Sequence, residues 1–148
     1  MKLLTQTNSR LFSLSILLLR CMVGVILFMG GSGKALGWFG GFGMAKTIGF
    51  YKMSGFSVLE TYLSSYTEFI GGFLFIIGFL TRPSAIAVLI NMIVATVVAM
   101  PKGFIMGTAS YPFLLAVIAF IFLLTGPMAY SLDALFFQRG PVIRELRR

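Results

Sequence analysis

The chain has 148 residues, of which 58% are hydrophobic and 11% are charged, whereas roughly a quarter of the residues of an average soluble domain are charged. This composition excludes an ordinary soluble protein and indicates an integral membrane protein with a handful of spanning helices in one domain. The formal charge of +8 does not indicate nucleic-acid binding, because the basic residues lie mostly at segment ends and in loops and form no basic helix face.

The first apolar run, residues 11–30, has the length of a membrane span and carries Arg20 near its middle. A charge at that depth costs about 3 kcal/mol or more unless another group compensates it, so Arg20 is a candidate functional residue. A cleaved signal peptide is the competing interpretation. The run is longer than the apolar region of a signal peptide, has a central Arg and is not followed by an A-x-A-like cleavage site. We therefore interpret it as an uncleaved first span.

The connection that follows, residues 31–61, is rich in glycine and aromatic residues. Its glycines cannot form a regular span, yet Trp38 is not typical of a solvated linker. An interfacial or re-entrant segment fits better. From Met44 to Met53 the apolar residues recur at helical spacing, which predicts a short amphipathic helix on the membrane surface.

Three further apolar runs follow, at residues 62–80, 84–100 and 111–130. Residues 81–83 leave room only for a tight antiparallel hairpin, because Pro83 fits an early helical position. After the fourth run, Ser131 can cap a short helix from Leu132 to Gln138, and residues 139–148 form a basic tail. The sequence therefore predicts an all-α, polytopic membrane protein: a four-transmembrane-helix bundle in a single domain, residues 1–148.

Basic residues beside the predicted spans give the orientation. With both termini inside, the cytoplasmic side receives seven of them and the outer side four. The excess of Lys and Arg on cytoplasmic loops favours cytoplasmic N and C termini in a multi-pass protein.

Three predicted spans each carry one strongly polar residue on a face of small side chains: Arg20, Glu68 and Asn91. Counting about 1.5 Å per residue, Arg20 lies about 15 Å and Glu68 about 9 Å from the outer ends of their helices. Because an Arg side chain can extend over that offset, we expect Arg20 and Glu68 to pair. The cluster would open toward Lys34, Trp38 and Tyr111.

Each of these residues has a structural alternative. Arg20 and Glu68 can form a buried pair that fixes helix register, in place of a ligand or proton site. Asn91 can have a purely structural role, as a hydrogen-bonding contact between helices. Trp38 and Tyr111 can belong to the aromatic belt at the membrane interface. The sequence has no His and one Cys, Cys21, which excludes His-ligated haem or copper, the usual zinc sets and a C-x-x-C pair.

The whole chain resembles the DoxX family of small four-helix bacterial membrane proteins. The matching residues are Leu18-Leu19-Arg20, Gly24, Phe28, Gly30 or Gly31, Gly33-Lys34, the Gly-Trp-Phe-Gly-Gly run at 37–41, residues 68–72, residues 78–82, Thr125-Gly126-Pro127 and Ser131-Leu132-Asp133. The resemblance implies a component of oxidoreductase systems in the bacterial plasma (inner) membrane, with polar residues at Arg20, Glu68 and Lys34. Relatives can carry a His in or after the third helix, where this chain has Asn91 and Lys102.

The resemblance and the residues together suggest a quinone-handling or anchoring subunit. Arg20 and Glu68 are the candidate catalytic residues, and Lys34, Trp38, Asn91 and Tyr111 are candidate ligand-binding residues for a quinone. The chain has no motif for flavin, haem or metal, so electrons would come from a soluble or membrane-bound partner. Membrane lipid and a second copy of the chain are the other partners to consider. The competing class is a non-catalytic scaffold or a binder or transporter of a small lipophilic molecule.

Overall fold

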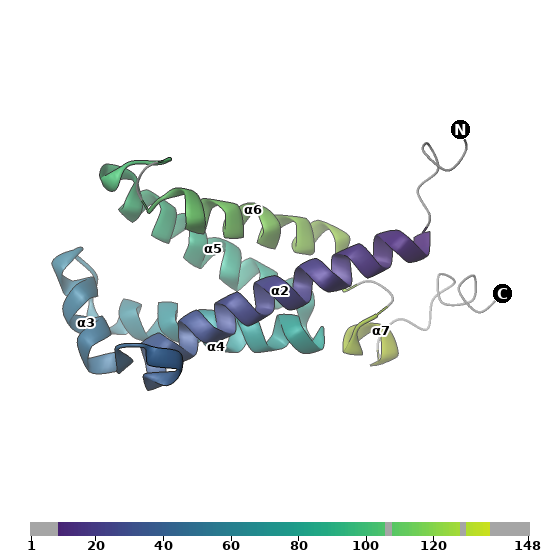
Figure 1. Ribbon diagram of the computed structural model, residues 1–148, viewed down its shortest axis with the longest axis horizontal. Helices are drawn as coiled ribbons and strands as arrows, with labels where there is room; N and C mark the ends of the chain where they lie inside the picture. Colours follow the sequence, from purple (N-terminus) through teal and green to yellow (C-terminus); the bar gives the residue numbers. More distant parts are fainter. Residues whose placement is uncertain (1–8, 106–107, 128–129, 137–148) are drawn as a thin grey trace.

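The protein is all-helical in a computed structural model that describes residues 9–105, 108–127 and 130–136 (Figure 1). The predicted basic tail, residues 139–148, lies outside these ranges, as do the chain termini. The helices, in chain order, are α2 (Ser9–Leu36), η1 (Trp38–Gly40), α3 (Gly43–Met53), α4 (Val58–Ile77), α5 (Thr81–Ala99), η2 (Met100–Lys102), α6 (Ser110–Thr125) and α7 (Leu132–Phe136).

The long helices pack mainly as two pairs, α2 with α4 and α5 with α6. Glycines bring α2 and α4 together: a Cβ added at Gly31 would lie 2.2 Å from the Phe69 nitrogen, and one at Gly72 would lie 2.3 Å from the Phe28 nitrogen. Only glycine permits such backbone approach, as the predicted small-residue faces require. The two pairs meet in a core that includes an edge-to-face contact between Phe75 and Phe122, with ring centroids 5.2 Å apart.

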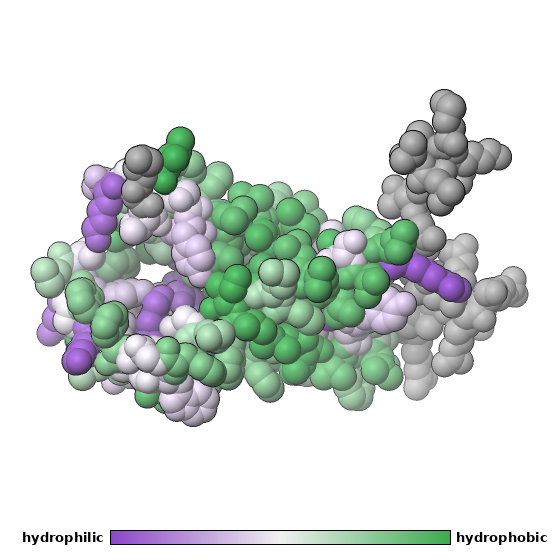
Figure 2. Space-filling model, viewed as in Figure 1, coloured by the Kyte–Doolittle hydropathy of each residue, from purple (hydrophilic) through white to green (hydrophobic). Residues whose placement is uncertain are grey.

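The pairs define two ends of the molecule, which we call the α3 end and the α7 end (Figure 1). The short helix α3 lies at the first, beside the start of α4, and α7 lies at the second, beside the turn between α4 and α5. Hydrophobic residues cover the middle of the molecule, and hydrophilic ones gather at the α3 end, where the surface is hollowed (Figure 2).

The structure corrects several predicted helix ends. Helix α2 does not end at Gly30 but continues to Leu36, because its glycine-rich last turns pack on α4 and tertiary contact outweighs the weak helix propensity of glycine. Helix α4 begins at Val58 with a capping box formed by Ser57 and Glu60. Helix α6 ends at Thr125, five residues before the predicted limit, where Gly126 takes a φ of 69°.

Two predicted local features are confirmed. The segment from Met44 to Met53 is helical, within α3. Ser131 caps α7, because its hydroxyl accepts a hydrogen bond of 3.0 Å from the Ala134 amide. The predicted end of that helix at Gln138 lies outside the described residues.

In the described part of the chain, two helical stretches are long and apolar enough to cross a membrane: Ser9–Leu36 and Thr81–Lys102. Helix α4 has 20 residues and carries Glu60 and Glu68, and α6 is apolar but has only 16 residues. Large hydrophobic side chains are exposed along all four of these helices. Such a surface is unfavourable in water and is expected of helices in contact with lipid.

Candidate functional site

The α3 end holds an ion pair between Lys34 and Glu68. Lys34 lies in the last turn of α2 and Glu68 lies in the middle of α4. The Lys34 ammonium donates to both carboxylate oxygens, at 2.6 and 2.7 Å. The Glu68 side chain is 8% exposed and that of Lys34 is 32% exposed. The pair is therefore half-open, with the carboxylate inside and the cation toward the surface.

Helix α3 supports this pair from the side. The Thr47 hydroxyl donates to the Lys34 carbonyl at 3.2 Å, and the Lys34 ammonium lies 5.9 Å from the centroid of the Tyr51 ring. An ammonium at that distance from an aromatic ring is attracted by its electrons. The Glu68 carboxylate and the Tyr51 ring together fix where the Lys34 charge lies.

Arg20 does not pair with Glu68, which corrects the central prediction from the sequence. Arg20 is 2% exposed and reaches the α7 end, where its two terminal nitrogens donate to the carbonyl oxygens of Pro127, at 2.7 Å, and Tyr130, at 2.5 Å. Its guanidinium packs against Gly78, ten residues beyond Glu68 and so about 15 Å further along α4. The error came from ending α2 at Gly30, which placed Arg20 at mid-depth and Lys34 in a loop.

Asp133 completes this arrangement at the α7 end. Its carboxylate accepts hydrogen bonds of 2.8 Å from the backbone nitrogens of Leu80 and Thr81, where α5 begins. The amide of Asp133 in turn donates to the carbonyl of Gly78 at 3.0 Å. Asp133 thus caps the start of α5, and Arg20 binds carbonyls of the connection between α6 and α7. Both are structural roles.

A cleft of about 560 Å³ opens beside the ion pair between α3, α4 and α5. Its size is that of a small-molecule site, and its lining is mostly apolar with a few polar groups. Asn91 lies in its wall and donates a long hydrogen bond of 3.4 Å to the Ser64 carbonyl. The described residues that line it are Tyr51, Ser54, Phe56, Glu60, Leu63, Ser64, Thr67, Ala87, Ile90, Asn91, Val94, Ala95, Val98, Ala99 and Lys102.

Of the other predicted ligand-binding residues, neither aromatic one lines this cleft. Trp38, in η1, packs edge-to-face on Phe69 with ring centroids 6.3 Å apart. Tyr111 is exposed at the start of α6, close enough for the charges of Lys34 and Glu68 to act on its hydroxyl. The structure therefore brings Lys34, Glu68, Trp38 and Tyr111 to the α3 end near the cleft, and leaves Arg20 at the other end.

Comparison with known proteins places this architecture in a family. The DoxX family model matches residues 15–101, which include both charged residues of the ion pair and Asn91. The chain belongs to the DoxX family. It is also 31% identical over 127 residues, 86% of this chain and 90% of the relative, to a protein of Bacillus subtilis (strain 168) named "Putative oxidoreductase CatD". No solved structure is significantly similar to this DoxX chain.

The sequence contained a signal for the Lys34–Glu68 pair that the prediction did not use. Gly24 and Gly31 lie seven residues apart on one helix face, and Lys34 lies one further turn along that face. Extending the helix by that turn would have placed Lys34 opposite Glu68. The cleft residues Glu60, in α4, and Lys102, in η2, had no comparable signal, because only the tertiary packing brings both to one cleft.

Proposed function

We propose that this DoxX protein is a quinone-binding component of an oxidoreductase system in the bacterial plasma membrane. In this proposal α2, α4, α5 and α6 all cross the bilayer and both termini lie in the cytoplasm. The hydrophobic middle of the molecule supports four spans (Figure 2), and the excess of basic residues beside the cytoplasmic ends supports the orientation. The α3 end then faces outward.

The observation that supports quinone binding best is the cleft at the α3 end. A quinone ring is flat and apolar and has two carbonyl oxygens that accept hydrogen bonds. The cleft offers apolar walls together with donors on Asn91, Tyr51 and Lys102. The name of the Bacillus subtilis relative, an oxidoreductase, supports the same class of function.

The Lys34–Glu68 pair gives the site its proton chemistry in this proposal. Reduction of a quinone to a quinol takes up two electrons and two protons, and oxidation of the quinol releases them. Glu68 lies next to Thr67 of the cleft wall, and Lys34 contacts Tyr51 of the same wall. We assign proton exchange to this pair and place the electron donor or acceptor on a partner oxidoreductase, because the chain has no His and a single Cys.

The test is quinone binding by the purified full-length protein in detergent. Trp38, the only tryptophan of the chain, packs on Phe69 beside Glu68, so its fluorescence reports a quinone bound nearby. We expect saturable quenching by a short-tailed ubiquinone or menaquinone. Lys34→Met and Glu68→Gln should weaken binding about tenfold, which corresponds to about 1.4 kcal/mol.

The matched control is Lys46→Met, because Lys46 is an exposed lysine of α3 outside the cleft. It should bind as the wild type does. Quenching that rises linearly with quinone, without saturation and equally in all variants, would reject quinone binding. Tight association with another membrane protein and no bound quinone would instead support the scaffold function, and a bound lipid alone would support a lipophile binder.

A further inference from the structure

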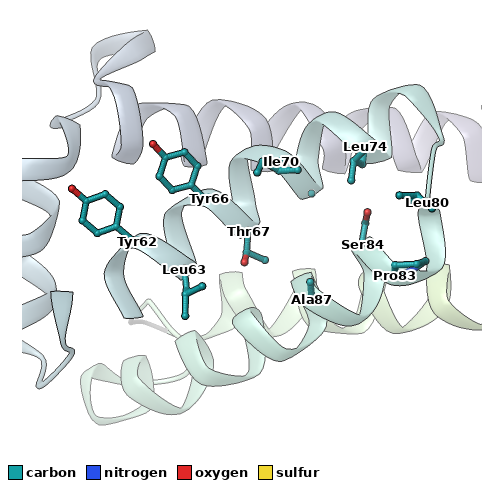
Figure 3. Close-up of a pocket in the computed structure, with 11 residues that line it drawn as sticks. Tyr62, Leu63, Tyr66, Thr67, Ile70, Leu74, Leu80, Pro83, Ser84 and Ala87 are labelled. Carbon is teal, nitrogen blue, oxygen red and sulfur yellow. The ribbon is translucent and has the colours of Figure 1, made fainter. Parts of the chain in front are cut away.

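A second cavity adjoins the cleft and lies along the surface between α4 and α5. This groove has a volume of about 460 Å³. It shares three lining residues with the cleft: Leu63, Thr67 and Ala87. Figure 3 shows Leu63 and Thr67 extending from α4 toward α5, and Ala87 extending from α5 toward α4. These three side chains lie at the junction, where the two cavities adjoin.

The groove differs from the cleft in chemistry. The cleft holds Glu60, Asn91 and Lys102, whereas none of the described residues that line the groove is charged. Its lining is Tyr62, Leu63, Tyr66, Thr67, Ile70, Gly71, Leu74, Leu80, Pro83, Ser84 and Ala87. The two adjoining cavities thus place a polar part at the α3 end beside an apolar part that runs toward the α7 end.

The groove is elongated and opens sideways. From Tyr62 to Leu74 it follows twelve residues of α4, about 18 Å. Leu63 is 60% exposed and Ile70 is 52% exposed. A chain molecule could therefore enter from the hydrocarbon layer without passing through water.

We propose that the groove holds the polyprenyl tail of the quinone whose ring lies in the cleft. This inference rests on the proposed function and adds to it the substrate class: a long-tailed membrane quinone, taken from and returned to the bilayer. A polar ring joined to a long apolar tail matches a polar cleft that adjoins an apolar groove. Burial of each methylene of the tail adds to affinity in proportion to its area.

Charge favours a quinone over a phospholipid as the occupant. The described lining of the cleft has one cationic side chain, Lys102, and one anionic side chain, Glu60, and these charges cancel. A neutral quinone ring suits this balance. A phosphate headgroup in the cleft would lie near the Glu60 carboxylate, and the two negative charges would repel each other.

The experiment compares two quinones with the same ring, one with a single isoprene unit and one with four, at one detergent concentration. Ala87→Phe fills the junction, and Ile70→Ala removes a wall that belongs to the groove alone. We expect Ala87→Phe to weaken the long-tailed quinone at least tenfold and Ile70→Ala to weaken it about fivefold. Ile70→Ala should leave the short-tailed quinone unchanged.

Matched controls come from Val97, which is exposed on α5 outside both cavities. Val97→Phe and Val97→Ala should bind both quinones as the wild type does.

The possible failures can be distinguished. If the wild type binds neither quinone, the proposed function fails. If both quinones bind but Ala87→Phe and Ile70→Ala affect them equally, ring binding stands and the tail assignment is overturned. The tail assignment also fails if Ala87→Phe releases a copurified phospholipid and leaves long-tailed quinone binding unchanged.

Discussion

The two ends of the bundle use the same kinds of charged side chain for different purposes. At the α7 end, Arg20 and Asp133 bind backbone carbonyls and amides that would otherwise lack partners. At the α3 end, Lys34 and Glu68 bind each other beside an open cleft. A buried charge satisfied by backbone is committed to the fold, whereas a half-open charge pair can exchange its partner for a ligand or a proton.

This comparison predicts the largest stability loss at the α7 end. Arg20→Ala removes a buried side chain and leaves the carbonyls of Pro127 and Tyr130 without their donors. We expect the free energy of unfolding to fall by at least about 3 kcal/mol, measured by thermal or denaturant unfolding in detergent. Arg20→Ala combined with Glu68→Gln should show additive losses, because the two residues do not interact. A large coupling energy between the two substitutions would instead support the Arg20–Glu68 pair that the sequence suggested.

At the α3 end the loss should be smaller and coupled. Lys34→Met and Glu68→Gln each break the ion pair, but solvent reaches the Lys34 side chain, so we expect about 1 to 2 kcal/mol for each. The double variant should lose less than the sum, with a coupling energy of about 1 kcal/mol. A full double-mutant cycle measures this coupling. Additive losses would show that the pair does not form in the membrane protein.

The cap on α5 should give the smallest of the three effects. Asp133→Ala removes both hydrogen bonds to the start of α5 and should cost about 1 kcal/mol. Hydrogen exchange of the Leu80 and Thr81 amides is the local measurement, and both should exchange faster in the variant. Unchanged protection of these amides would show that another group caps the helix.

The sequence was informative about helices and faces but not about partners. The apolar runs predicted the long helices, and the small-residue faces of Gly24, Gly31 and Gly72 predicted which faces of α2 and α4 meet, but not their register. The end of α2 was missed, because glycine signals a helix end locally while packing on Phe69 keeps the helix intact. That one error moved Lys34 out of the bundle and gave Glu68 the wrong partner.

Two other features left no readable pattern in the sequence. Arg20 binds carbonyl oxygens, which every residue has, so no side-chain type marks its partner. The cleft joins residues of α3, α4 and α5 that are up to about fifty positions apart. Such a site depends on the angle at which α5 diverges from α4 at the α3 end. The periodicity of apolar residues in a helix does not predict that angle.

The central claim is that ligand binding belongs to the α3 end and fold maintenance to the α7 end. The most direct test compares the quinone dissociation constant and melting temperature of Asn91→Leu and Asp133→Asn. We expect Asn91→Leu to weaken quinone binding about tenfold with little change in melting temperature, because its hydrogen bond to Ser64 is long. Asp133→Asn should lower the melting temperature and leave quinone binding unchanged. The opposite pattern, with binding lost in folded Asp133→Asn and kept in Asn91→Leu, would contradict the account.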